Sequence, residues 1–155
     1  MEKIAYQFED FLQDVQPAYQ AFAAGVHKNF AAQGCKVKIE SKASGFLVSY
    51  AHPKTKRSLL NFVFRKKSLM VRLYPSDVSR CAELLDSPPE RMEKEIAKSP
   101  VCKRLLDPAD CNSRCPMGYD ITVRGTRYQK CRYSCFLFTV TNESIPFIQD
   151  FIKLL

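Results

Sequence analysis

Residues 45–74 read GFLVSYAHPKTKRSLLNFVFRKKSLMVRLY, and this stretch decides the fold. Apolar and polar side chains alternate in three of its segments, Phe46–Tyr50, Leu60–Phe64 and Leu69–Leu73. A period of two is typical of strands with one buried face, and the polar links between the segments have the length of turns. Together with Val37 and Ile39 upstream, the stretch predicts a four-stranded antiparallel meander. We expect one face of the meander to bury a shared set of residues: Phe46, Val48, Tyr50, Phe62, Phe64 and Val71.

Helical patterns flank this meander on both sides. Apolar residues recur at helical spacing within 2–15 and again from Pro17, where a break is expected, to Gly34. Residues 76–107 read as three short helices, and a last apolar helical stripe follows Ser144. The chain therefore begins and ends with helices that have an apolar face to bury.

The region between the middle and last helices completes the predicted architecture. Alternation within 119–140 predicts a hairpin whose second arm is one long strand or two strands. The chain thus predicts one α+β domain over residues 1–155, with a cysteine-rich loop and hairpin at 111–135. Its core is a mainly antiparallel sheet of about six to seven strands, on which the N-terminal, middle and C-terminal helices pack.

The positive charge of the chain is concentrated in the meander. Residues 35–75 hold ten basic residues and one acidic residue, a net charge of +9, against +8 for the whole chain. A local field of this kind attracts anions, whereas dispersed charge mainly keeps a protein soluble. The candidate residues for an anionic ligand or partner are Lys54, Lys56, Arg57, Arg65, Lys66, Lys67 and Arg72.

Two interpretations of the basic meander stay open. Lysines could contact phosphates while exposed aromatic residues stack on bases, which would make this a nucleic-acid-binding protein. Alternatively, the aromatic residues form the core, and the lysines are the solvated charge that commonly protects a sheet edge. The sequence has none of the motifs of common nucleic-acid-binding domains.

Four cysteines form two pairs with equal spacing: Cys111, Cys115, Cys131 and Cys135. Two close pairs of thiolates from separate segments can surround a tetrahedral Zn²⁺ ion, so the pattern predicts a structural zinc site. The seven cysteines of the chain are an odd number, which argues against a complete disulfide framework. Buried thiols without a metal are the simpler alternative.

Strand geometry raises an objection to four equivalent ligands. In one regular strand, Cys131 and Cys135 would lie roughly 13 Å apart, at about 3.3 Å per residue, too far for one ion. Either the strand breaks between them, or Cys135 is a core residue and the site is built on Cys111, Cys115 and Cys131. In the second case the fourth ligand is Cys102, a histidine or water.

An enzyme is disfavoured but not excluded. The chain contains no glycine-rich phosphate loop, no nucleophile elbow and no zinc-protease motif. We interpret His27 as a structural or surface residue of a helix and His52 as an exposed turn residue. Dispersed active-site residues would be sought on a sheet surface lined by Tyr50, Phe62, Arg72 and Tyr74.

The stretches Phe46–Tyr74 and Phe136–Leu155 resemble small bacterial α+β proteins of the YdhG-like kind. This resemblance covers about half of the chain and includes no catalytic motif, so it assigns no functional residue. Met1–Ile4 lacks the pattern of a secretion signal, and no segment approaches the roughly 20 apolar residues of a membrane span. We expect a cytosolic zinc-binding protein without membrane partners, acting as a binding or regulatory module for an anionic ligand or partner.

Overall fold

The computed structural model describes residues 4–112 and 114–155. The predicted helix start at Glu2 and the Met1–Lys3 end therefore lie outside the described residues, as does Ser113 of the cysteine pattern. The chain divides into two compact units. Unit 1 takes in residues 4–71 and 139–141, and unit 2 takes in 72–138 and 142–155. The prediction of a single domain stays a prediction.

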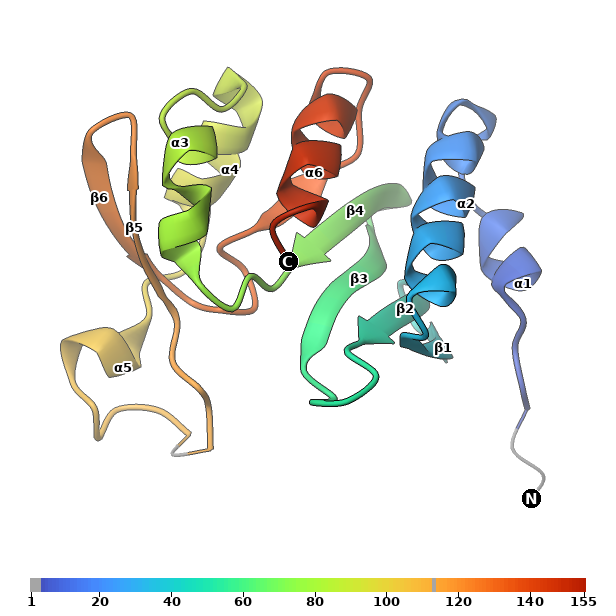
Figure 1. Cartoon of the computed structure of the whole chain (residues 1–155), viewed down its shortest axis with the longest axis horizontal. Helices are drawn as coiled ribbons and strands as arrows, with labels where there is room; N and C mark the ends of the chain where they lie inside the picture. The colour runs from blue at the N-terminus through green and yellow to red at the C-terminus, as the bar shows by residue number, and fades with distance from the viewer. Residues whose placement is uncertain (1–3, 113) are drawn as a thin grey trace. The chain divides into compact units, whose positions relative to one another are not determined.

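The structure is α+β, as predicted (Figure 1). A five-stranded antiparallel sheet has the strand order β1-β2-β3-β4-β7, and a separate hairpin joins β5 to β6. The strands are β1 (Lys36–Lys42), β2 (Gly45–Ala51), β3 (Ser58–Arg65), β4 (Ser68–Leu73), β5 (Tyr119–Val123), β6 (Thr126–Lys130) and β7 (Leu137–Thr139). The helices are α1 (Phe8–Leu12), α2 (Pro17–Ala32), a 3-10 helix (Val78–Cys81), α3 (Ala82–Leu85), α4 (Glu90–Lys98), α5 (Lys103–Leu106) and α6 (Ser144–Ile152).

Unit 1 confirms the meander and its buried face, except that Phe46 is half-buried. Lys36 pairs with Ala51 at one end of the β1–β2 ladder and Lys42 pairs with Gly45 at the other. Helices α1 and α2 lie against one face of the sheet: the Phe11 and Phe22 rings contact Phe62 at centroid distances of 5.3 and 6.4 Å. Every residue of β3 between its ends is buried, because β3 is the central strand of the five.

Gly45 shows why the second strand begins where it does. Its φ angle is +128°, a conformation that L side chains rarely adopt, and a Cβ atom there would lie 2.8 Å from the Phe64 ring. Glycine at this position therefore lets the phenyl ring of the central strand pack directly against the β1–β2 turn.

Unit 2 is built around a second aromatic core and the β5–β6 hairpin. Phe136 contacts Phe151 of α6 at 4.9 Å and Tyr119 of β5 at 5.0 Å. The buried ammonium group of Lys130 donates hydrogen bonds to Ala97 O at 2.9 Å and Ser99 O at 2.8 Å. These carbonyls lie at the end of α4, where a cation also complements the helix dipole. Lys130 thus connects β6 to the end of α4 through two hydrogen bonds.

The long arm predicted after the hairpin turn is two strands separated by a turn. Strand β6 ends at Lys130 and β7 begins at Leu137. Between them, the backbone N–H groups of Ser134 and Cys135 both donate to Cys131 O, at 3.1 and 2.9 Å. The strand break that the sequence left open is therefore observed, and Cys135 is also buried in the core.

Candidate functional site

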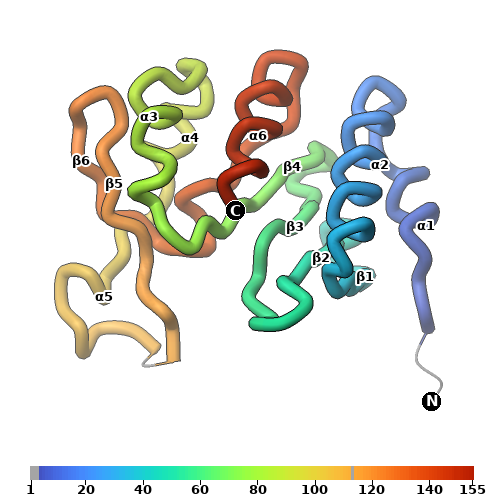
Figure 2. The backbone as a smooth tube through the Cα atoms, viewed as in Figure 1, coloured from blue at the N-terminus to red at the C-terminus, as the bar shows by residue number. Residues whose placement is uncertain are grey.

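The structure divides the seven basic candidates instead of gathering them. Lys54, Lys56 and Arg57 belong to the β2–β3 turn, whereas Arg65 ends β3 and Lys66 and Lys67 form the β3–β4 turn. Figure 2 shows these two turns at opposite ends of the sheet in unit 1. β3 joins them and has eight residues, so the two ends lie roughly 25 Å apart at about 3.3 Å per residue. Arg72 is part of unit 2 and belongs to neither end.

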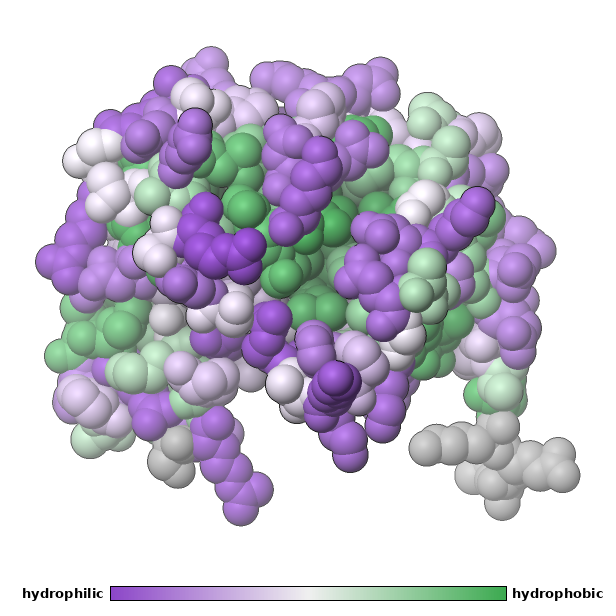
Figure 3. Space-filling view, in the orientation of Figure 1, coloured by the Kyte–Doolittle hydropathy of each residue, from purple (hydrophilic) through white to green (hydrophobic). Residues whose placement is uncertain are grey.

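Most of these cations have no carboxylate beside them. On β1, Glu40 forms ion pairs with Lys38 at 3.5 Å and Lys42 at 3.4 Å. By contrast, five exposed basic residues at the two sheet ends form no ion pair within residues 4–112 and 114–155. They are Lys54, Lys56, Arg65, Lys66 and Lys67. Figure 3 shows strongly hydrophilic residues over the β2–β3 turn. Each turn therefore presents positive charge to solvent.

The backbone of both turns is unusual at the lysines. Lys56, Lys66 and Lys67 have φ angles of 60°, 52° and 66°, in the left-handed region that favours glycine and asparagine. Lys66 and Lys67 form the two-residue link between β3 and β4, a position where Asn-Gly is the common sequence. Their side chains are exposed, so burial does not compensate for this conformation. Two like charges are thus held side by side in a conformation that costs stability.

His52 lies in the β2–β3 turn, as interpreted from the sequence, but it is half-buried instead of exposed and has a structural role. Its Nδ1 accepts hydrogen bonds from the backbone N–H groups of Lys54 at 3.2 Å and Thr55 at 3.1 Å. Its backbone N–H donates to Arg57 O at 2.8 Å. The imidazole therefore fixes the loop that displays the basic side chains.

Four of the five aromatic residues considered for stacking on bases are buried, and the fifth, Phe46, is half-buried. Tyr50 and Phe62 are fully buried beneath the helices of unit 1, and Phe64 and Tyr74 are also buried. The alternative interpretation of these aromatic residues, as core, is the one observed. Tyr50 and Phe62 belong to unit 1, whereas Arg72 and Tyr74 belong to unit 2, so the structure describes no single site from these four residues.

The first cysteine pair lies in a polar loop of unit 2. Cys111 is exposed and Cys115 is half-buried. Asn112 shapes the turn between them, since its side-chain oxygen accepts from the Arg114 N–H at 3.0 Å and its carbonyl accepts from the Cys115 N–H at 3.0 Å. The guanidinium of Arg104 donates to Cys115 O. The first pair is therefore held in a compact turn whose backbone is hydrogen-bonded to Arg104.

The second pair lies in the turn that follows β6. Because this turn replaces the predicted extended strand, the roughly 13 Å separation of Cys131 and Cys135 does not apply. The Cys135 side chain is nevertheless completely buried, and burial raises the pKa of its thiol. A metal binds the thiolate, so Cys135 is the least suitable ligand of the four.

Zinc binding stays a prediction. Across the described parts of the chain, no three His, Cys, Asp or Glu side chains are grouped so that they could hold a metal ion. Cys102, the alternative fourth ligand, is buried against Gly118, where a Cβ atom would lie 2.8 Å from the Cys102 Sγ. The structure thus places Cys111, Cys115, Cys131 and Cys135 in two turns without converging them on one point.

A polar contact that sequence reasoning missed lies in unit 1. His27 Nδ1 and the Tyr50 hydroxyl are 2.8 Å apart, and the His27 ring stacks on Phe8 with a centroid distance of 3.8 Å and an interplanar angle of 6°. These residues come from α2, β2 and α1, so no local sequence pattern joins them. The only available signal was the position of His27 beside the apolar face of its helix.

Comparison of the chain with protein-family models, curated proteins and solved structures found no match. The resemblance to YdhG-like proteins therefore stays a prediction. Among the residues that the structure describes, none of the helices has the length and apolar character needed to cross a membrane.

Proposed function

We propose that unit 1 is a non-enzymatic module that binds an extended polyanion, such as the phosphate backbone of a nucleic acid. The observation that carries this proposal is the placement of unpaired lysines in left-handed backbone conformations at both sheet ends. Strained residues that packing does not explain are often retained for function. Exposed lysines are point charges suited to phosphate groups.

The separation of the two ends favours a long ligand over a small one. A single phosphate or carboxylate cannot reach both turns across roughly 25 Å of strand. A nucleic-acid backbone repeats its charge along its length and can contact both ends at once. Affinity for a polyanion therefore combines two clusters that are individually weak.

The buried aromatic residues determine the kind of recognition. Because the meander rings are buried, or half-buried in the case of Phe46, binding rests on contacts to the phosphate backbone. Such contacts carry no sequence information and weaken steeply as salt concentration rises. The proposed module is thus a sequence-independent binder whose affinity depends on ionic strength.

Fluorescence anisotropy with a labelled DNA hairpin tests this proposal over about 50 to 300 mM salt. We expect the logarithm of the binding constant to fall linearly with the logarithm of salt concentration. Lys54→Glu with Lys56→Glu, and separately Lys66→Glu with Lys67→Glu, should each reduce the slope by about 1.8, since each phosphate contact contributes about 0.9.

A matched control separates local contacts from net charge. Lys28→Glu with Lys98→Glu changes the charge equally but lies outside both turns, in α2 and α4. These control substitutions should leave most of the slope intact. No binding at low salt, or an equal loss in the control, would overturn the proposal.

A further inference from the structure

Unit 1 contains a pocket of about 350 Å³ whose walls come from three parts of the chain. Residues 6–9 form one wall, His27 of α2 a second, and Val37 and Ile39 of β1 the third. Tyr6 is held by an edge-to-face contact with Phe46 at 5.1 Å. The pocket is therefore an open recess whose exposed lining is mainly polar, with aromatic and aliphatic side chains beside the polar groups.

The hydrogen bond to Tyr50 determines which nitrogen of His27 carries the proton. Burial raises the pKa of the Tyr50 hydroxyl, so this group stays protonated. Within the described residues, His27 Nδ1 is the hydrogen-bond partner of that hydroxyl, and a buried O–H without an acceptor would be costly. The Tyr50 O–H therefore donates to Nδ1, and the proton of the neutral imidazole resides on Nε2.

The remaining nitrogen is then a donor with a fixed position. Nδ1 and the stacked face of the ring are occupied by Tyr50 and Phe8, which leaves Nε2–H for a ligand. Glu9 lines the same pocket and supplies a carboxylate acceptor. Burial lowers the His27 pKa, although Glu9 opposes this effect, so the neutral donor form is favoured near pH 7.

We infer that this pocket binds a small, neutral, planar molecule with a hydrogen-bond acceptor adjacent to a donor, as in a cyclic or aromatic amide. The ligand acceptor faces His27 Nε2–H and its donor faces the Glu9 carboxylate. An anion would be repelled by Glu9, and a simple ammonium ion has no acceptor for the N–H of His27. The volume lies near the lower end of the range of about 300–1,000 Å³ for ligand sites, which suits a molecule with a single ring.

This site is independent of the proposed polyanion binding. Its lining residues belong to neither basic turn, and the ligand that it selects carries no charge. Free heterocycles and the carboxamides of larger molecules share this chemistry, so uracil and nicotinamide represent the two sources.

Nuclear magnetic resonance of protein with ¹⁵N-labelled histidine tests the inference directly. Titration with uracil or nicotinamide should shift the Nε2 signal of His27 and leave that of His52 unchanged. Toluene, which matches the apolar shape without the amide, should bind at least roughly tenfold more weakly, the usual effect of losing a hydrogen bond. Absence of a His27 shift with both amides, or equal binding of toluene, would overturn the inference.

Tyr50→Phe provides a second test that keeps the buried ring. Without the hydroxyl, the Nε2–H form of His27 should lose population in the ¹⁵N spectrum, and affinity for the preferred amide should fall several-fold. Tyr128→Phe in unit 2 is the matched control and should change neither quantity. Unchanged affinity in a folded Tyr50→Phe protein would rule out the positioning role, and the wild-type comparison with toluene stands without this variant.

Discussion

Lys66 and Lys67 are the residues at which a change should affect stability and binding in opposite directions. Both have left-handed backbone conformations, which cost residues with a Cβ atom roughly 1 kcal/mol or more each. Lys66→Asn with Lys67→Gly supplies the sequence preferred for such a turn and removes the repulsion between neighbouring ammonium groups. We expect the free energy of unfolding to rise by about 1 kcal/mol in urea titrations.

The same double variant should bind the DNA hairpin more weakly than wild type. A neutral variant that keeps the strain, Lys66→Gln with Lys67→Gln, should lose affinity similarly without gaining as much stability. Equal stability of the two variants would show that the left-handed conformation costs this turn little.

His27 gives unit 1 a stability that depends on pH. Burial lowers its pKa below the ordinary histidine value of 6.5, and the nearby Glu9 raises it to a smaller extent. A base with a lower pKa in the folded state binds protons preferentially when unfolded. The stability that neutral His27 contributes is therefore fully present at pH above its pKa in the unfolded chain. This stability is lost as pH falls through its pKa in the folded state.

Urea unfolding at about pH 7.5 and about pH 5.5 checks this expectation. The decrease in unfolding free energy between the two conditions should be smaller in His27→Gln than in wild type. Other titrating groups are common to both proteins and cancel in the difference. An identical decrease would mean that His27 is not responsible.

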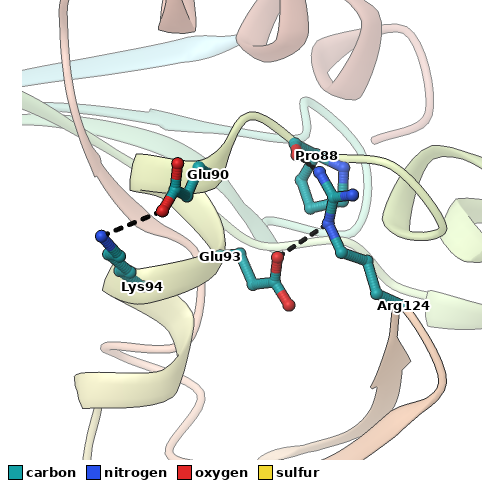
Figure 4. Close-up of polar contacts among 5 residues, drawn as sticks. All are labelled: Pro88, Glu90, Glu93, Lys94 and Arg124. Carbon is teal, nitrogen blue, oxygen red and sulfur yellow. Dashed lines mark hydrogen bonds and ion pairs between the residues drawn. The ribbon is translucent and has the colours of Figure 1, made fainter.

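At the scale of elements, Arg124 connects the β5–β6 turn to α4 (Figure 4). Its Nε lies 2.7 Å from Glu93 Oε2, and its Nη2 donates to Pro88 O. Arg124→Met removes both contacts but keeps a side chain at the same left-handed position. The free energy of unfolding should fall by about 1 kcal/mol, because the carbonyl contact adds to a partly screened ion pair.

The Glu90–Lys94 pair in the same view is the matched control for Arg124. Its ion pair measures 3.1 Å, but the side chains of Lys94 and Glu90 are 67% and 80% exposed. Lys94→Met should therefore change the free energy of unfolding by only about 0.3 kcal/mol. If both variants lost the same free energy of unfolding, Arg124 would contribute no more than an ordinary surface ion pair.

The cysteine turns lead to a prediction about metal content. If Cys115 and its partners bind zinc, protein purified without a tag should contain about one zinc ion per chain. Cys115→Ser should then lower the midpoint of thermal unfolding by several degrees, because metal binding contributes to folding free energy. Cys35→Ser, a half-buried cysteine of unit 1, is the control. Zinc-free wild-type protein from a reducing preparation would end the hypothesis.

The meander was predictable because its side chains alternate with a period of two around turn-length links. The break after Lys130 was not decided by pattern, since Phe136 and Phe138 continue an alternation that fits a longer strand. Its physical cause is local: Cys131 O accepts two backbone hydrogen bonds and closes a turn. Residue type alone could not predict whether the backbone after Lys130 continues as a strand or forms a turn.

The candidate sites were predictable only as residue sets. Clustering in sequence identified the basic turns, but their separation follows from strand direction, which places successive turns at opposite sheet ends. The left-handed backbone conformation of the lysines could not be predicted from the sequence, because glycine and asparagine are the residues that normally indicate it. The contact between His27 and Tyr50 joins positions 23 residues apart, which only the packing of α2 on the sheet brings together.

At the scale of the molecule, the positive field is confined to one segment. Residues 35–75 carry a net charge of +9 of a total of +8, so the remainder of the chain is close to neutral. A diffuse basic surface would gain affinity smoothly as a polyanion lengthens. Two clusters at fixed separation should instead produce a threshold length.

Duplex DNA gains one phosphate per strand for about every 3.4 Å, so roughly seven base pairs span the distance between the turns. Hairpins with stems of about 5, 10 and 15 base pairs should therefore show a large rise in affinity at the first step and little at the second. Lys66→Glu with Lys67→Glu removes one end and should abolish the first rise, whereas Lys28→Glu with Lys98→Glu should retain it. A gradual increase that is identical in all three proteins would indicate attraction to net charge, because only two separated contacts create a length that must be spanned.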